Sequence, residues 1–278
     1  MGSSGPIERW ALHEGIEDLR LNIEVELDYH FPAAADVLLC LEAAQLPDQL
    51  LLEDLLTVDG AGPLSPIAGE DGIGRRTWLN AEGPFAARYH AIVDVARPAA
   101  SIDGLAAVPL RELPAEVVPY LWPSRYCQAD RFEAFVERRF GALQGGAKVL
   151  EMAEWIRAEI DYVAGSSDSS TTAVDSFVSR QGVCRDYAHL LASFARAAGI
   201  PARLVSAYAW QLDPPDFHAL VEVWLDGDWR LADATCLAPL EGMVRIAVGR
   251  DATDIAFMTI FGEARMNAQS VRVTRVRE

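Results

Sequence analysis

The Asp226-Gly227 dipeptide constrains the possible folds of this chain more than any other feature, because it separates two short apolar runs. Residues 218–225 are His-Ala-Leu-Val-Glu-Val-Trp-Leu, and residues 228–233 are Asp-Trp-Arg-Leu-Ala-Asp. Asp-Gly between such runs predicts an antiparallel β-hairpin that is closed by a two-residue type I′ turn. The turn also sets the register, in which Leu225 pairs with Asp228 across the two strands.

That register brings His218 and Asp233 onto one face of the hairpin. Leu220 then lies opposite Asp233, and His218 lies opposite Thr235. The histidine and the aspartate become diagonal neighbours with Cβ atoms about 7 Å apart, a gap that a hydrogen bond between their side chains can close. A carboxylate in this position fixes the tautomer of an imidazole and stabilises the imidazolium. Without a further partner, the pair would be an ordinary strand-end histidine and aspartate that face solvent.

Cys184 supplies such a partner, because it lies where a polar loop meets an apolar helical pattern (Leu190, Leu191, Phe194 and Ala198). The start of a helix carries partial positive charge and free N–H groups, which favour the thiolate form of a cysteine. The thiolate is the nucleophile in covalent catalysis, although free cysteines are also among the most often buried residues. The order cysteine, histidine, aspartate along the chain favours the catalytic interpretation.

The first part of the chain has the pattern of an antiparallel β-sheet. Apolar and polar residues alternate from Leu19 to Tyr29, which predicts a half-buried strand, and further strands are expected at 36–41 and 88–95. Gly, Pro and Asp are frequent between these last two segments, so turns and short strands are expected there. We therefore expect an all-β region at the N-terminus.

A proline series follows this region and interrupts regular structure (Pro98, Pro109, Pro114, Pro119 and Pro123). Such spacing is typical of an extended connector, and we place a domain boundary in it near residue 115. Residues 1–115 would then form an N-terminal β-rich domain, and residues 116–278 a catalytic core with a C-terminal strand.

Helices and then strands are predicted beyond the boundary, which gives an α+β fold. Helices are expected at 130–140 and at 147–163, the second with an apolar face (Leu150, Ala153, Ile156 and Ile160). The polar run at 165–172 is expected to be a solvated loop or a mobile flap over the site. The cysteine helix should end at Gly199 and Pro201. Strands are expected after it (202–210, 218–225, 229–233 and 270–276).

The composition excludes several classes of function. The formal net charge of −17 argues against nucleic acid and against an anionic membrane surface, since both require clustered Lys and Arg. No apolar run approaches the roughly 20 residues that span a bilayer, and the N-terminus lacks the order of a signal peptide, so a cytoplasmic protein is expected. The four cysteines form no CxxC pair, and no EF-hand pattern is present, so no metal site, cofactor or disulfide is expected.

Around the three candidate residues the sequence resembles the transglutaminase-like superfamily, in particular bacterial transglutaminase-like enzymes and cysteine proteases. The matching segments share the positions of the three residues and their neighbours (182–190, 199–203, 216–223 and 229–235, with weaker likeness at 123–127 and 249–252). The resemblance covers about residues 120–260 and implies a papain-like core, in which the cysteine helix packs against an antiparallel sheet. It assigns Cys184 as nucleophile, His218 as general base and Asp233 as the residue that orients the histidine.

The chain departs from many members of that family at two positions. Leu220 stands where many have tryptophan two residues after the histidine, and Ala234 stands where many have proline after the aspartate. Neither change removes an atom of the triad, but both affect the shape of the pocket and leave the substrate class open.

Other residues near the triad have a structural and a functional interpretation. The Cys184 N–H should belong to an oxyanion hole, and Gln181 could supply the second donor, although a backbone contact of this glutamine is the stronger expectation. Asp186 suits the helix dipole. Tyr187 could border the cleft or pack, and His189 is expected to be a packed core histidine.

Two further groups are expected to be structural rather than catalytic. Arg250 and Asp251 could form an ion pair or reach the cleft. Trp210, Trp224 and Trp229 could wall a substrate groove, but Trp224 and Trp229 are cross-strand partners in the predicted hairpin, so sheet packing explains them.

These residues together favour an enzyme that acts on amide bonds of peptides or proteins through a thioester. With water as acceptor the enzyme would be a protease or amidase, and with an amine it would be a transglutaminase. A non-catalytic binding module with the same fold, or acyl transfer from a thioester donor, are the alternatives. The sequence leaves the natural substrate, the oligomeric state and the role of the N-terminal domain open.

Overall fold

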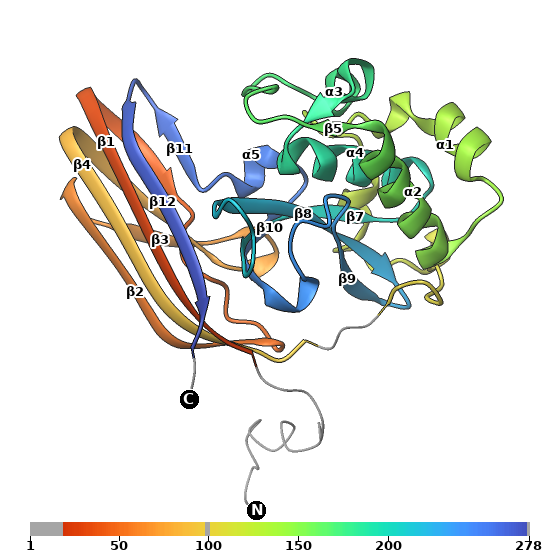
Figure 1. Ribbon diagram of the computed structural model, residues 1–278, viewed down its shortest axis with the longest axis horizontal. Helices are drawn as coiled ribbons and strands as arrows, with labels where there is room; N and C mark the ends of the chain where they lie inside the picture. Colours follow the sequence, from red (N-terminus) through yellow and green to blue (C-terminus); the bar gives the residue numbers. More distant parts are fainter. Residues whose placement is uncertain (1–18, 98–100, 277–278) are drawn as a thin grey trace, which may run out of the picture.

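The computed structural model describes residues 19–97 and 101–276. Residues 1–18 of the expected N-terminal domain and Pro98 of the proline series lie outside the described residues. The described chain forms two large antiparallel sheets, with most of the helices gathered around the second one (Figure 1). None of the helices in the described ranges is long and apolar enough to cross a membrane.

The first sheet is built on two long strands, β1 (Leu19–Leu39) and β4 (Arg75–Val95). Its remaining strands are β2 (Gln49–Ala61), β3 (Ser65–Ala68), β11 (Met258–Phe261) and β12 (Arg265–Arg275). The strict alternation of buried and exposed residues at the start of β1 confirms the predicted half-buried strand. The expected second strand at 36–41 is instead a continuation of β1 beyond a bulge between Phe31 and Ala35.

The C-terminal strand does not belong where the sequence analysis placed it. We grouped it with residues 116–278, but β12 pairs antiparallel with β1, with Ile23 opposite Val273. In Figure 1 the blue β12 accordingly lies among the red and yellow strands from the start of the chain. Pairing with β12 covers backbone groups of β1 that would otherwise form an open sheet edge. The boundary near residue 115 stays a prediction.

The proline-rich segment and the region after it contain short helices. Three of these are 3₁₀ turns, namely η3 (Leu110–Glu112), η4 (Val118–Leu121) and η5 (Ala129–Arg131). The longer helices are α1 (Glu133–Phe140), α2 (Gly145–Glu159), α3 (Ala173–Ser179) and α4 (Cys184–Ala197). Within residues 19–97 and 101–276 there are also two further 3₁₀ turns, η2 (Glu70–Gly72) and η6 (Leu240–Gly242), and the short α5 (Ala252–Ile255).

Helix α2 differs from its prediction in its end and in its buried face. It ends at Glu159, because the next residues form β5 (Asp161–Tyr162), which pairs parallel with β6 (Gln181–Gly182). The buried face consists of Val149, Met152 and Ile156, whereas Leu150 is 40% exposed. The buried face of α2 is therefore shifted by about one residue from the apolar face that we predicted.

Helix α3 lies in a stretch for which we predicted no helix. Its start is fixed by a capping box, in which the Asp175 N–H donates to Thr172 Oγ1 and the Thr172 N–H donates to Asp175 Oδ2. The sequence Thr-x-x-Asp before an apolar residue was the available signal. The polar run before it is a loop, as expected.

The second sheet carries the candidate site and has the strand order β10-β7-β8-β9. Its strands are β7 (Ala202–Ala209), β8 (Phe217–Leu225), β9 (Asp228–Ala232) and β10 (Met243–Gly249), of which β10 was not predicted. Helix α4 buries Leu190, Leu191 and Phe194 completely, in one cluster with Leu204, Val221 and Val223 of the sheet. This arrangement confirms the predicted α+β fold with the cysteine helix packed on an antiparallel sheet.

The two sheets share a hydrophobic core. Tyr208 of β7 packs against Tyr89 of β4, with ring centroids 6.1 Å apart, and Val244 and Ile246 of β10 belong to the same cluster. The Tyr208 hydroxyl donates to the Leu41 carbonyl at 2.5 Å. The N-terminal sheet therefore packs directly on the sheet that holds the site.

Candidate active site

The predicted hairpin is present with the predicted turn and register. Leu225 pairs with Asp228, and Trp224 pairs with Trp229. Asp226 and Gly227 both have positive φ angles, of 51° and 76°, as a type I′ turn requires. The local sequence signal therefore sets the register of β8 and β9 correctly.

The hairpin pairing stops earlier than we expected. Val221 and Ala232 are the last partners, so the predicted pairs of Leu220 with Asp233 and of His218 with Thr235 do not form. The reason is a turn after Ala232, in which the Thr235 N–H and Oγ1 both donate to Asp233 Oδ1 at 2.8 Å. This turn holds the Asp233 carboxylate beside β8.

His218 and Asp233 are hydrogen-bonded despite the shorter pairing. His218 Nε2 lies 2.8 Å from Asp233 Oδ2, and the two side chains are only 1% and 4% exposed. Burial alone would lower the pKa of the imidazole. The hydrogen bonds and charges of Asp233 and of the Cys184 thiol outweigh this effect and raise the His218 pKa to about 10. His218 is therefore an imidazolium at neutral pH.

Cys184 is the first residue of α4 and is half-buried. The helix start is fixed by Asp186, whose Oδ2 accepts from the Val183 N–H at 2.8 Å. A Cβ at Gly182 would lie 2.7 Å from the Asp186 Cβ, so only glycine fits before the helix. Because His218 Nε2 is bonded to Asp233, Nδ1 is the nitrogen that remains for Cys184.

The other cysteines have different surroundings. Cys40 and Cys127 are buried, and burial raises the pKa of each thiol to about 11. Cys236 is exposed, and partial burial followed by the charge of Asp233 raises its pKa. Neither buried thiol is a candidate nucleophile for an external substrate.

Two neighbours of Cys184 in the helix have structural roles. His189 is fully buried, accepts from the Ala252 N–H through Nε2 at 3.2 Å, and stacks on Tyr126. Burial lowers its pKa to about 3, so it stays neutral, as expected of a packed core histidine. Tyr187 is also buried, and its hydroxyl donates to the Ile160 carbonyl.

Arg250 and Asp251 do not form the ion pair that we considered. Arg250 pairs with Asp254 at 3.0 Å. Asp251 caps α5 by accepting from the Thr253 N–H at 2.9 Å, and it also accepts from the Tyr126 N–H at 3.1 Å. Both residues are thus structural, as we favoured.

The tryptophans pack rather than line a groove at the thiol. Trp224 and Trp229 contact each other edge to face, with centroids 5.2 Å apart, and the Arg203 guanidinium lies 4.2 Å from the Trp229 ring. Trp210 packs against the shared core of the two sheets.

The polar loop at 165–172 is tied to the cysteine helix. Arg185, the second residue of α4, donates to the Asp168 carbonyl at 2.8 Å and to Ser167 Oγ at 3.2 Å. The Tyr126 hydroxyl donates to the Ser169 carbonyl at 2.6 Å. The loop thus lies close to the start of α4, where Cys184 is located.

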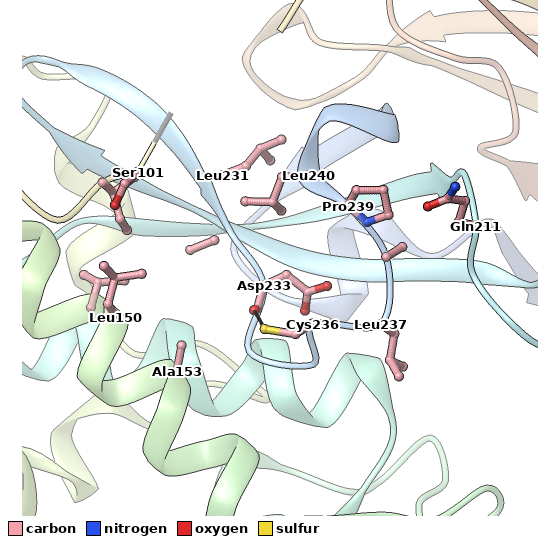
Figure 2. Close-up of a pocket in the computed structure, with 14 residues that line it drawn as sticks. Ser101, Leu150, Ala153, Gln211, Leu231, Asp233, Cys236, Leu237, Pro239 and Leu240 are labelled. Carbon is pink, nitrogen blue, oxygen red and sulfur yellow. Dashed lines mark hydrogen bonds between the residues drawn. The ribbon is translucent and has the colours of Figure 1, made fainter. Parts of the chain in front are cut away.

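A cavity of about 440 Å³ lies beside Asp233 (Figure 2). Its walls are mostly apolar, and they include Leu150 of α2, Leu231 and Leu240, with Asp233 and Cys236 at the same end. Neither Cys184 nor His218 lines it. The cavity therefore contacts Asp233 but not the Cys184 thiol. Residues 19–97 and 101–276 contain no group of three or more His, Cys, Asp or Glu side chains that could hold a metal ion.

Two interactions of the site were not predicted from the sequence. Thr235 holds Asp233, and the Asp-x-Thr spacing of a side-chain-capped turn was its signal. Tyr162 of β5 interacts with the Cys184 N–H and thiol. No periodic pattern marks Tyr162, because β5 and β6 contain only two residues each. Gln181 is exposed in β6, and its role as an oxyanion donor stays a prediction.

Comparison with known proteins gives the same family for the core. The model of the transglutaminase-like superfamily matches residues 134–234, which include all three candidate residues. The crystal structure of a "putative cysteine protease" from Cytophaga hutchinsonii resembles this chain with a TM-score of 0.88 and 34% identity. That likeness covers 94% of this chain and 92% of the other. An uncharacterised protein of Mycobacterium leprae is 30% identical over 148 residues, which are 49% of this chain and about half (52%) of that relative.

Proposed function

Because this chain belongs to the transglutaminase-like superfamily, we propose that it is an enzyme with Cys184 as nucleophile that acts on amide bonds of peptides or proteins. The observation that carries the proposal is the buried hydrogen bond of 2.8 Å between His218 and Asp233, with the imidazole also in contact with the Cys184 thiol. A base oriented by an acid and placed at a nucleophile is the arrangement that covalent catalysis requires.

In the proposed reaction the Cys184 sulfur attacks the amide carbon, and the carbonyl electron pair moves onto oxygen. When this oxyanion collapses, the C–N bond breaks, and His218 transfers its proton to the leaving amine. The product is a thioester between Cys184 and the acyl group. His218, now neutral, accepts a proton from the second acceptor, which attacks the thioester and releases the thiolate.

Water and a primary amine are the two acceptors that this chemistry allows. With water the products are those of a protease or amidase, and with an amine a new amide forms as in a transglutaminase. We infer a peptide or protein substrate from the description of the Cytophaga hutchinsonii structure as a cysteine protease. A cytoplasmic location and the absence of a required cofactor stay predictions.

Alkylation by iodoacetamide near pH 7 tests whether Cys184 is activated. Peptide mass spectrometry should find Cys184 labelled much faster than the exposed Cys236 in the same native protein. His218→Ala should slow this labelling to the rate of an ordinary thiol, because the imidazolium that would stabilise the thiolate is lost. Equal rates at Cys184 and Cys236 would favour a non-catalytic binding module with this fold.

A peptide library then separates the two acceptors. The wild type and Cys184→Ala are incubated with the library, with and without an added primary amine, and the peptides are analysed by mass spectrometry. Cleavage that depends on Cys184 identifies a protease. A mass gain equal to the amine less ammonia identifies transamidation, and acyl transfer from an added thioester donor is scored in the same assay.

A further inference from the structure

The backbone of β5 places Tyr162 next to the start of the cysteine helix. In the parallel pair of β5 with β6, Tyr162 lies opposite Gly182, two residues before Cys184. The Val163 N–H donates to the Gly182 carbonyl at 3.0 Å, and the Asp161 N–H donates to the Arg180 carbonyl at 2.8 Å. Hydrogen bonds on both sides of Tyr162 thus fix its backbone relative to the helix start.

The Tyr162 side chain reaches the reacting atoms. Its hydroxyl lies close enough to the backbone N–H and the thiol of Cys184 for both groups to affect its pKa. Its ring packs on Tyr187, with centroids 5.7 Å apart, and Tyr187 is itself anchored by its hydroxyl to the Ile160 carbonyl. The Tyr162 ring is 47% exposed, so it has room to turn toward a bound substrate.

The hydroxyl keeps its proton over the working pH range of an enzyme. Burial, followed by the electrostatic interaction with Cys184, raises the Tyr162 pKa to about 12. A protonated phenol can donate a hydrogen bond, and donors near a thiol nucleophile stabilise the oxyanion that forms on the attacked carbonyl.

We propose that Tyr162 is a catalytic residue that forms the oxyanion hole together with the Cys184 N–H. The proposal rests on the proposed function. In the free protein the phenol oxygen lies beside the Cys184 N–H and so occupies the place of the substrate's carbonyl oxygen. When a substrate binds, its carbonyl oxygen takes this N–H, and the Tyr162 hydroxyl turns to donate to the same oxygen. Tyr162 is then the second hydrogen-bond donor, a role that the sequence analysis considered for Gln181.

Substitution by phenylalanine tests the donor without changing the ring. The probe is p-nitrophenyl acetate, whose ester carbon is attacked by the Cys184 sulfur. The C–O bond to p-nitrophenolate then breaks, and an acetyl thioester remains on the enzyme. Release of p-nitrophenolate is measured for the full chain as wild type, Tyr162→Phe, Tyr187→Phe and Cys184→Ala. Tyr187→Phe is the matched control, because it also removes one tyrosine hydroxyl but not one that contacts Cys184.

Iodoacetamide alkylation of the same variants supplies a second measurement. This reaction displaces iodide from a saturated carbon and forms no oxyanion, so it reports the nucleophile and the fold alone. We expect Tyr162→Phe to lower kcat for p-nitrophenolate release by about 100-fold or more, with a much smaller change in KM. Its Cys184 alkylation rate should stay within about threefold of the wild type, and Tyr187→Phe should retain both rates.

The outcomes separate the two proposals. A decrease in kcat of less than about tenfold in Tyr162→Phe, or an increase, would overturn the role of Tyr162 while leaving Cys184 as nucleophile. A parallel loss of alkylation would do the same, because it would assign Tyr162 a purely structural role. If the wild type releases p-nitrophenolate no faster than Cys184→Ala, the proposed function fails, and the oxyanion hole fails with it.

Discussion

Replacement of Asp233 by asparagine measures how strongly the buried carboxylate holds the charge on His218. The His218 pKa of about 10 exceeds the ordinary value of 6.5, a difference worth on the order of 5 kcal/mol in favour of the imidazolium. Burial opposes this charge, so Asp233 and Cys184 together supply the whole effect. Asparagine keeps the shape but carries no charge. If Asp233 supplies about half of the effect, the pKa in Asp233→Asn falls to about 8 or lower.

Nuclear magnetic resonance of the histidine ring carbons is the direct assay. In protein with ¹³C-labelled histidine, the His218 signal is assigned from its loss in His218→Ala and is followed from pH 5 to 11. His189 provides an internal control in the same spectra, because burial lowers its pKa to about 3 and its signal should not move. Transfer of an acyl group should fall by about 10³- to 10⁴-fold in Asp233→Asn, as in other triads that lose the acid.

The raised pKa of His218 also sets the sign of the pH dependence of stability. His218 has a higher pKa in the folded protein than its unfolded value of 6.5, so its contribution is complete below about pH 6.5. That contribution is lost as the pH rises through about 10. The difference in free energy of unfolding between wild type and Asp233→Asn should therefore shrink over this range. A His218 pKa near 6.5 in the wild type, or equal values in both proteins, would refute the reasoning.

Two further substitutions test the scaffold around the site. Glu222 is fully buried between Arg203 and Arg245, and each ion pair measures 2.7 Å. Glu222→Gln should therefore lower the free energy of unfolding in urea by about 3 to 5 kcal/mol, because both guanidiniums would lose a charged partner. A change below about 1 kcal/mol would mean that the arginines find other partners. In Gly182→Ala the new Cβ would lie 2.7 Å from the Asp186 Cβ and push the helix start away. This substitution should lower the free energy of unfolding by about 1 to 3 kcal/mol and slow the alkylation of Cys184. Unchanged labelling of Cys184 in a destabilised Gly182→Ala would contradict this account.

The parts of the site that could be predicted from the sequence are those determined locally. The Asp226-Gly227 turn sets the register of β8 and β9 through backbone geometry alone, and it brings His218 near Asp233. The error came at the end of the hairpin, where side-chain hydrogen bonds of Thr235 to Asp233 compete with strand pairing. The start of α4 at Cys184 was likewise predictable, because polar loop residues precede an apolar helical stripe.

Contacts between distant segments could not be predicted. Strand β12 pairs with β1 from the opposite end of the chain, and no turn or periodic signal links the two. Tyr162 reaches Cys184 through a parallel pair of only two residues on each strand, which leaves no pattern in the sequence. Such contacts depend on how whole elements pack, and periodicity describes each element only by itself.

The N-terminal sheet is a structural part of the site rather than an appended module. In β8, Glu222 is four residues from His218 and is bonded to Arg245, which also pairs with Asp48 between β1 and β2. Arg97 bonds the same Asp48 at 2.8 Å and donates to the Met243 carbonyl at the start of β10.

A partly buried chain of charges thus joins the strand that carries His218 to the N-terminal sheet. Removing the N-terminal part of the chain would leave Arg245 without Asp48 and would expose Tyr208 and Val244 to water. Strand β8 carries His218 next to Cys184. Asp233 can hold the His218 imidazolium only while this strand keeps its position. Rigid supports behind catalytic groups hold the geometry on which their chemistry depends. The N-terminal sheet therefore supports the proposed catalytic geometry by fixing β8, whether or not it contacts a substrate.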